Sequence, residues 1–140
     1  MKPWVGFALM SMFFAGLTSV IAKLGLAGIS GELGLVVRTA VITVLVAGFA
    51  LVFVPVEEWS RLGWRSGLWL ALSGLTTTLS WIFYYKALKQ GDVATVALID
   101  KGSILVAVVL AVFILKERVT WNTLGGGVLI VAGLLWISRK

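Results

Sequence analysis

The chain has 140 residues, of which 60% are hydrophobic and only 13% are charged. A soluble globular domain carries about 25% charged residues and needs a polar exterior over its large surface. No stretch of this sequence supplies one, so we expect the outer surface to face lipid. The absence of cysteine and histidine excludes disulfides, thiolate or imidazole catalysis and the common zinc sites. We therefore expect no catalytic residue, metal or cofactor.

The net charge of +6 raises the question of nucleic-acid binding. The twelve lysines and arginines are scattered singly or in pairs between apolar runs, whereas nucleic-acid-binding domains gather them on one face. Basic residues at the ends of membrane helices explain this scatter better, so we expect no nucleic-acid partner.

Five apolar runs are long enough to be spanning helices. A helix rises about 1.5 Å per residue, so about 20 apolar residues cross the hydrocarbon core. In chain order the runs are residues 4–22, 33–54, 67–85, 93–115 and 120–138. The segments between them are short and contain glycine, proline, serine and charged residues, which are typical of turns. The sequence predicts one all-α integral membrane domain over residues 1–140, a bundle of five transmembrane helices.

The basic residues near the predicted helix ends do not favour one orientation. Lysine and arginine normally gather on the cytoplasmic side. Here the loops fall alternately on two sides, and each side carries five basic residues: Lys2, Arg61, Arg65, Lys116 and Arg118 on one, and Lys23, Lys86, Lys89, Arg139 and Lys140 on the other. Either copies insert in both orientations and pair antiparallel, or other features fix one orientation.

Asp100 is the acidic residue that lies deepest in a predicted span. It is about eight residues into the fourth run, roughly 12 Å deep at helical rise. A charge near the middle of the bilayer costs about 2.5–3.5 kcal/mol on insertion scales, so Asp100 needs a partner or a cavity. It is therefore either a functional group or one half of an ion pair with Arg38 or a lysine.

Three basic residues accompany this acid. Arg38 lies early in the second run, Lys101 directly follows Asp100, and Lys23 closes the first run. Their long side chains either line a pathway or extend to the nearer interface. All four residues come from helix portions near the same predicted membrane side. We expect a vestibule with three positive charges and one negative, whose field favours an anionic or zwitterionic solute.

Polar and small residues mark two further helix faces. Ser73, Thr77, Ser80 and Tyr84 share one face of the third run, with Trp81 beside them. This face predicts either hydrogen bonds between helices or the wall of a solute path. Small residues in the last two runs predict close helix packing, within the chain or at a dimer interface: Ala107, Ala111, Gly126, Gly127 and Gly133.

The order of these features resembles a single five-helix half of the drug/metabolite transporter superfamily, the EamA domain. The matching positions are Lys23, Arg38, Tyr85-Lys86-Ala87-Leu88, Gly91, Ala97 to Leu115, Lys116-Glu117-Arg118 and Gly126 to Gly133. The segment Ile99-Asp100-Lys101-Gly102-Ser103 looks like the Asp-Lys pair of the short, single-domain branch. Many EamA halves carry a proline near Lys101-Gly102, and this chain has none there.

The resemblance implies one half of an inverted-repeat transporter, because full-length relatives hold two five-helix halves. This chain would reproduce that arrangement by antiparallel pairing of two copies. The resemblance also implies export or exchange of a small polar metabolite across a bacterial inner membrane by alternating access, often coupled to protons. Asp100 would then carry the proton, while Arg38, Lys101 and Lys23 would attract a carboxylate or balance Asp100. The expected partners are the lipid bilayer, a small solute, protons and a second copy.

Two other functions stay open. A cationic drug exporter would use a bare Asp100 together with cation–π contacts from Trp81 and Tyr84. A non-transporting lipid-handling or assembly subunit would use its intramembrane charges only to pair helices. The sequence names neither the solute nor the coupling ion nor the direction of flux.

Overall fold

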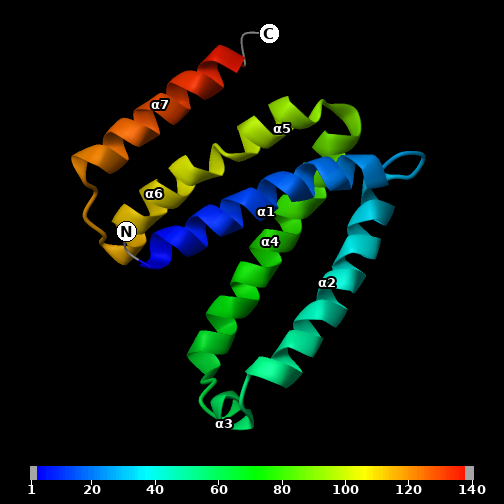
Figure 1. The fold of residues 1–140 in the computed structure, drawn as a ribbon. Helices are drawn as coiled ribbons and strands as arrows, with labels where there is room; N and C mark the ends of the chain where they lie inside the picture. Colours follow the sequence, from blue (N-terminus) through cyan, green and yellow to red (C-terminus); the bar gives the residue numbers. More distant parts are fainter. Residues whose placement is uncertain (1–2, 138–140) are drawn as a thin grey trace. The chain divides into compact units, whose positions relative to one another are not determined.

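The computed structural model describes residues 3–137, and every regular element in this part of the chain is a helix. Lys2, Ser138, Arg139 and Lys140, which the sequence analysis used, lie outside the described residues. The helices are α1 (Pro3–Gly25), α2 (Gly31–Phe53), α3 (Val56–Trp59), α4 (Trp64–Gln90), α5 (Val93–Asp100), α6 (Ser103–Leu115) and α7 (Trp121–Ile137). Figure 1 shows them in chain order.

Three helical stretches of the described chain are long and apolar enough to cross a membrane. They are α1, α2 and the stretch Val93–Leu115, which contains α5 and α6. Helix α7 is apolar but shorter. Helix α4 has 27 residues, and its serines, threonines and charged ends make it more polar than the other three. The large apolar side chains of these helices are mostly exposed in the single chain, as expected of surfaces that face lipid.

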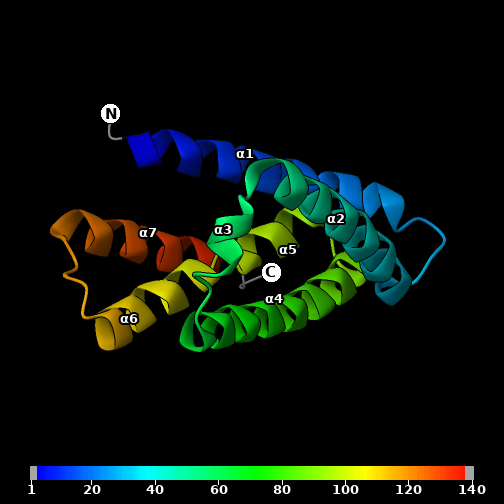
Figure 2. The same ribbon diagram turned by 90° about the horizontal axis from the view of Figure 1, so that it is seen from below.

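The chain divides into two compact units, which are described separately. Unit 2 covers Val20–Gln90. Within it α2 and α4 run antiparallel and contact each other, with the short α3 in the connection between them (Figures 1 and 2). Gly31 makes room for the backbone of α4, and Gly34 makes room for Leu26, which lies between α1 and α2. A Cβ on Gly31 would lie 3.0 Å from the carbonyl oxygen of Tyr85, and one on Gly34 would overlap the side chain of Leu26.

The turn between α1 and α2 has clear local causes. Gly28 has a φ of 76°, a left-handed conformation that glycine adopts without steric cost and that commonly follows a helix. Ser30 then caps α2, because its hydroxyl accepts a hydrogen bond from the backbone N–H of Leu33 at 3.1 Å. Glu32 follows in the first turn, where a negative charge interacts favourably with the helix dipole.

Unit 1 covers Met1–Ser19 and Gly91–Lys140, and in its described part α5 contacts α7. The sequence predicted a single helix over residues 93–115. The structure interrupts it between α5 and α6, at Lys101 and Gly102. There the N–H of Gly102 bonds the carbonyl of Ile99 at 2.9 Å, and the N–H of Ile104 bonds that of Lys101 at 3.1 Å. These three-residue spacings tighten the backbone, so the helix breaks without a proline.

Candidate functional site

Arg38 of α2 lies against two aromatic side chains of α4. Its guanidinium carbon is 4.1 Å from the centroid of the Trp81 ring and 5.8 Å from that of Tyr85. Both distances are within the range of cation–π attraction, about 6 Å. Trp81 and Tyr85 are one helical turn apart on α4, so they present neighbouring rings to the same cation. We call these three residues the Arg38 cluster.

The guanidinium of Arg38 is not fully satisfied by hydrogen bonds. Its Nη1 atom is inaccessible to solvent and has no hydrogen-bond partner among the described residues. A guanidinium has five N–H donors and no acceptor. Leaving a buried donor unpaired costs about 1–3 kcal/mol, and more for a charged group. Such a group in a native structure calls for a physical explanation, and a ligand that supplies acceptors is one.

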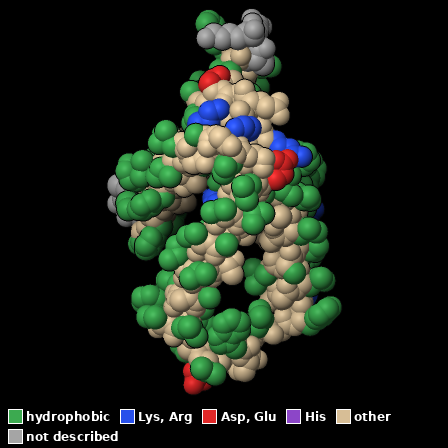
Figure 3. Space-filling model, turned by 90° about the vertical axis from the view of Figure 1, so that its right-hand side faces the viewer, with side chains coloured by type: hydrophobic (Ala, Val, Ile, Leu, Met, Phe, Trp, Pro, Cys, Tyr) green, Lys and Arg blue, Asp and Glu red, His purple; other side chains and the backbone are tan. Residues whose placement is uncertain are grey.

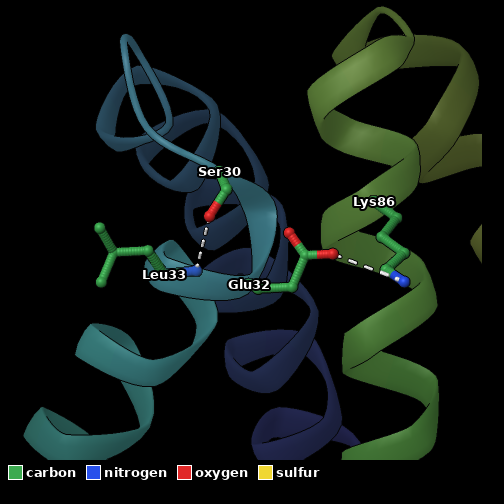
Figure 4. Close-up of polar contacts among 4 residues, drawn as sticks. All are labelled: Ser30, Glu32, Leu33 and Lys86. Atoms are coloured by element: carbon green, nitrogen blue, oxygen red, sulfur yellow. Dashed lines mark hydrogen bonds and ion pairs between the residues drawn. The ribbon is translucent and has the colours of Figure 1, made fainter.

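The three lysines of unit 2, by contrast, join its helices. The ammonium of Lys23 donates to the carbonyl of Leu88, and that of Lys89 donates to the carbonyl of Leu26 at 3.0 Å. The ammonium of Lys86 pairs with the carboxylate of Glu32 at 3.5 Å, as Figure 4 shows. These contacts tie the end of α1 and the start of α2 to the end of α4. Lys23, expected to line the solute path, is therefore engaged with backbone in this structure.

On the predicted polar face of α4, the hydroxyl of Thr77 bonds within its own helix. The hydroxyl of Thr77 donates to the carbonyl of Ser73 at 2.8 Å, and both residues are exposed in the single chain. Tyr84 is half-buried, and its ring lies 6.5 Å from that of Tyr85. Of this predicted face, the structure brings Trp81 to Arg38, whereas the hydrogen bond between Thr77 and Ser73 stays within α4.

Asp100 and Lys101 lie in unit 1, at the break between α5 and α6. The ammonium of Lys101 is 3.6 Å from a carboxylate oxygen of Asp100. The side chain of Asp100 is 35% exposed and that of Lys101 is 51% exposed. The acid therefore has an adjacent cation, and it sits where the helical hydrogen-bond pattern is interrupted.

The small residues predicted to pack helices make few close contacts within the chain. A Cβ on Gly126 or Gly133 would meet no described atom within 4 Å, and one on Gly127 would reach Leu105 at an ordinary 3.8 Å. Ala107 is exposed and Ala111 is half-buried. These faces are therefore open for another molecule, and their role at a dimer interface stays a prediction.

Two residues that the sequence analysis did not select have notable positions. Tyr85 is 4% exposed and completes the Arg38 cluster; its spacing of four residues from Trp81 was the available signal. Gly102 is closely packed, because a Cβ there would lie 2.9 Å from the carbonyl oxygen of Ile99 and 3.0 Å from the Cδ1 of Leu134. No sequence pattern indicated that contact.

The sequence was compared with known proteins and families. Residues 2–139 match the model of the EamA-like transporter family. A protein of Sinorhizobium sp named "Uncharacterized transporter in cobO 3'region" is 38% identical over 137 residues, which are 98% of this chain and 97% of that protein. No solved structure matches the chain. Together with its apolar helices, these matches show that the chain belongs to the EamA-like transporter family and is a multi-pass membrane transporter.

Proposed function

We propose that this protein moves a small polar metabolite with an anionic group across the bacterial inner membrane by alternating access, working as an antiparallel homodimer. The observation that carries the proposal is the state of Arg38. Its charge is held by aromatic rings, and Nη1 has no hydrogen-bond partner among the described residues. A carboxylate or phosphate supplies the paired acceptor oxygens that a guanidinium matches best.

The neighbouring cations support this choice of Arg38. Lys23 and Lys89 donate to backbone carbonyls, and Lys86 faces Glu32. These lysines have polar partners on neighbouring segments of unit 2, whereas Arg38 lies against the ring faces of Trp81 and Tyr85. In this proposal the change between transport states uncovers Nη1, which is inaccessible to solvent here. An anion then gains a charge-assisted hydrogen bond at Arg38 without breaking a hydrogen bond of Nη1.

The cationic drug exporter is less well supported. That function needs an aromatic face free to receive a cation and an acid without a partner. Here the ring of Trp81 is already covered by Arg38, and the carboxylate of Asp100 has Lys101 at 3.6 Å. A cationic substrate would have to displace Arg38 to reach the Trp81 ring, and Lys101 to reach Asp100. An anionic or zwitterionic solute is therefore favoured.

The balanced basic residues and the family support antiparallel pairing. Inverted repeats with a site at their interface are a general transporter plan, and the five predicted spans correspond to one such repeat. Two copies inserted in opposite orientations would supply both repeats. The open faces at Ala107, Ala111, Gly126, Gly127 and Gly133 would provide contact surfaces for the second copy.

We assign proton coupling to Asp100 in this proposal. A carboxylate at mid-span is costly while charged and is therefore suited to take up a proton as the transporter changes state. The break at Lys101 and Gly102 supports the assignment, because interrupted helices line the binding sites of many transporters. Lys101 would hold the charged form of the acid between proton transfers.

The proposal is tested in two steps. A thermal-shift screen of metabolites on the purified protein identifies compounds that stabilise it by mass action, and uptake of those compounds is then measured in proteoliposomes. We expect carboxylates and other anionic or zwitterionic compounds to stabilise the protein and to be transported. Arg38→Gln should weaken their binding by about tenfold to a hundredfold, which corresponds to about 1.5–3 kcal/mol for a charged hydrogen bond.

The matched control is Arg65→Gln, the same change at an exposed position of α4. It should leave solute binding unchanged. The proposal fails if only cationic compounds stabilise the protein, or if the two substitutions weaken binding equally.

A further inference from the structure

A polar pocket of about 400 Å³ lies between the start of α2 and the end of α4. Its lining comes from two short segments of unit 2: Ser30, Gly31 and Glu32, and Lys86, Lys89 and Gln90. The close approach of the helices at Gly31 brings these segments together, because the position of a Cβ there is only 3.0 Å from the carbonyl oxygen of Tyr85. We call this the α2/α4 pocket.

The pocket offers groups of both charges. Figure 4 shows the Glu32 carboxylate directed toward the ammonium of Lys86, which it approaches to 3.5 Å. Their side chains are 63% and 51% exposed, and an exposed ion pair contributes little to stability. The ammonium of Lys89 donates one hydrogen bond to the carbonyl of Leu26. Because an ammonium has three N–H donors, others are left for a ligand. The pair can therefore open for a ligand at small cost.

The first turn of α2 adds one backbone donor to this pocket. The N–H of Leu33 is taken by the Ser30 hydroxyl and that of Gly34 by the Ser30 carbonyl. The Glu32 carboxylate accepts a hydrogen bond from the N–H of its own residue, which lowers the pKa of this carboxyl group. Helix geometry leaves the N–H of Gly31 without a partner inside its own helix. The lysines and this amide attract a negative group, while the Glu32 carboxylate attracts a positive one.

The pocket is placed where a spanning helix begins. Helix α2 is long and apolar enough to cross the membrane, so its first turn lies at the level of the lipid headgroups. Figure 3 shows charged side chains gathered on one part of the visible face, beside hydrophobic side chains. A lipid whose chains lie along that apolar surface would bring its headgroup to the charged part.

From this arrangement we propose that the α2/α4 pocket binds the phosphoethanolamine headgroup of a membrane phospholipid. The phosphate lies between the ammonium groups of Lys86 and Lys89 and the Gly31 amide, and the headgroup ammonium donates to the Glu32 carboxylate. A zwitterionic headgroup pairs with both the positive and the negative side chains of the pocket. A headgroup with only negative charge would instead be repelled by the Glu32 carboxylate. The site is distinct from the Arg38 cluster and does not depend on the proposed function.

The first test uses the wild-type protein, so folding of a variant is not involved. The protein is released from nanodiscs that contain equal amounts of phosphatidylethanolamine, phosphatidylcholine and phosphatidylglycerol, and retained lipids are identified by native mass spectrometry. We expect phosphatidylethanolamine to be retained preferentially. Stepwise methylation of the headgroup nitrogen should lower retention, because a trimethylated nitrogen cannot donate a hydrogen bond to Glu32.

The second test assigns the site. Glu32→Gln should reduce the preference for phosphatidylethanolamine over phosphatidylcholine by about fivefold, the size expected when one ion pair is lost. Glu57→Gln, the same change at an exposed glutamate of α3 in the same unit, should leave it unchanged. Lys86→Arg should keep the preference, because it keeps the charge.

Three results would overturn the proposal. One is equal retention of the three lipids, and another is an equal effect of the two glutamate substitutions. The third is full displacement of the lipid by equimolar glycerophosphoethanolamine, a soluble compound with the same headgroup. That last result would show that the pocket recognises the free headgroup and that the lipid chains contribute nothing.

Discussion

The guanidinium carbon of Arg38 lies 4.1 Å from the centroid of the Trp81 ring. The contact joins α2 to α4 in a helix pair whose other large side chains are mostly apolar, and it holds a cation there by a ring face in place of a carboxylate. Nη1 of the same group has no hydrogen-bond partner among the described residues. The ring contact therefore stabilises the charge, while one of its donor atoms keeps an unmet capacity for hydrogen bonding.

Replacing Arg38 separates a functional role from a structural one. Arg38→Met removes a cation–π attraction worth about 0.5–2 kcal/mol but also removes an unpaired buried donor that costs about 1–3 kcal/mol. We expect the free energy of unfolding to stay within about 1 kcal/mol of wild type, or to rise, while transport is lost. Unfolding is measured in detergent micelles by circular dichroism and transport in proteoliposomes.

Lys23→Met is the matched comparison, because Lys23 donates to the carbonyl of Leu88. Loss of this charged hydrogen bond should lower the free energy of unfolding by about 1–2 kcal/mol. If Arg38→Met destabilises the protein more than Lys23→Met does, and transport falls only in proportion to folded protein, the role of Arg38 is structural.

The sequence was informative about the helices and less so about their ends. Long apolar runs dictate helices in lipid, since every backbone polar group must be satisfied within its own segment. Helix α4, however, extends to Gln90, beyond its predicted apolar range, and Lys86 and Lys89 in this extension have partners on the neighbouring segments. No proline lies at the interruption at Lys101 and Gly102, so the usual sequence signal for a helix break is missing there.

The candidate site was only partly predictable for a related reason. An ionisable residue in a span is visible from the sequence, and this is how Arg38 and Asp100 were selected. Which ring meets Arg38 depends on the register between α2 and α4, and Gly31 approaches the carbonyl oxygen of Tyr85 closely at this contact. The spacing of Tyr85 from Trp81 places both on one face of α4, but its burial depends on that register.

Gly102 should tolerate no larger residue. A Cβ there would approach the carbonyl oxygen of Ile99 to 2.9 Å and the Cδ1 of Leu134 to 3.0 Å, and the first of these is backbone that cannot move aside cheaply. We expect Gly102→Ala to lower the free energy of unfolding by about 1–3 kcal/mol. Gly6→Ala, where a Cβ meets nothing within 4 Å, should be neutral or stabilising. Equal melting temperatures for both variants would contradict this prediction.

Asp100→Asn should remove the response of transport to pH. The amide keeps the size and hydrogen-bonding capacity of the protonated acid but cannot exchange a proton, so an imposed pH gradient should no longer drive uptake. Exchange of solute between equal pH values should persist at a reduced rate. Uptake in proteoliposomes with and without a gradient measures this directly. Asp92→Asn is the control, since Asp92 caps α5 through the N–H of Thr95. A gradient response preserved in Asp100→Asn would exclude the coupling role.

Dual insertion predicts that the C-terminus is found on both sides of the membrane. A reporter active only in the cytoplasm and one active only outside it, each fused to the C-terminus, should both give signal in separate cultures. Basic residues decide orientation, so adding two lysines beside Arg118 should shift the population toward one side, and adding two beside Lys89 should shift it toward the other. Each biased variant alone should transport poorly, and coexpression of the two should restore transport. Signal from one side only, with full activity, would show that parallel or single copies suffice.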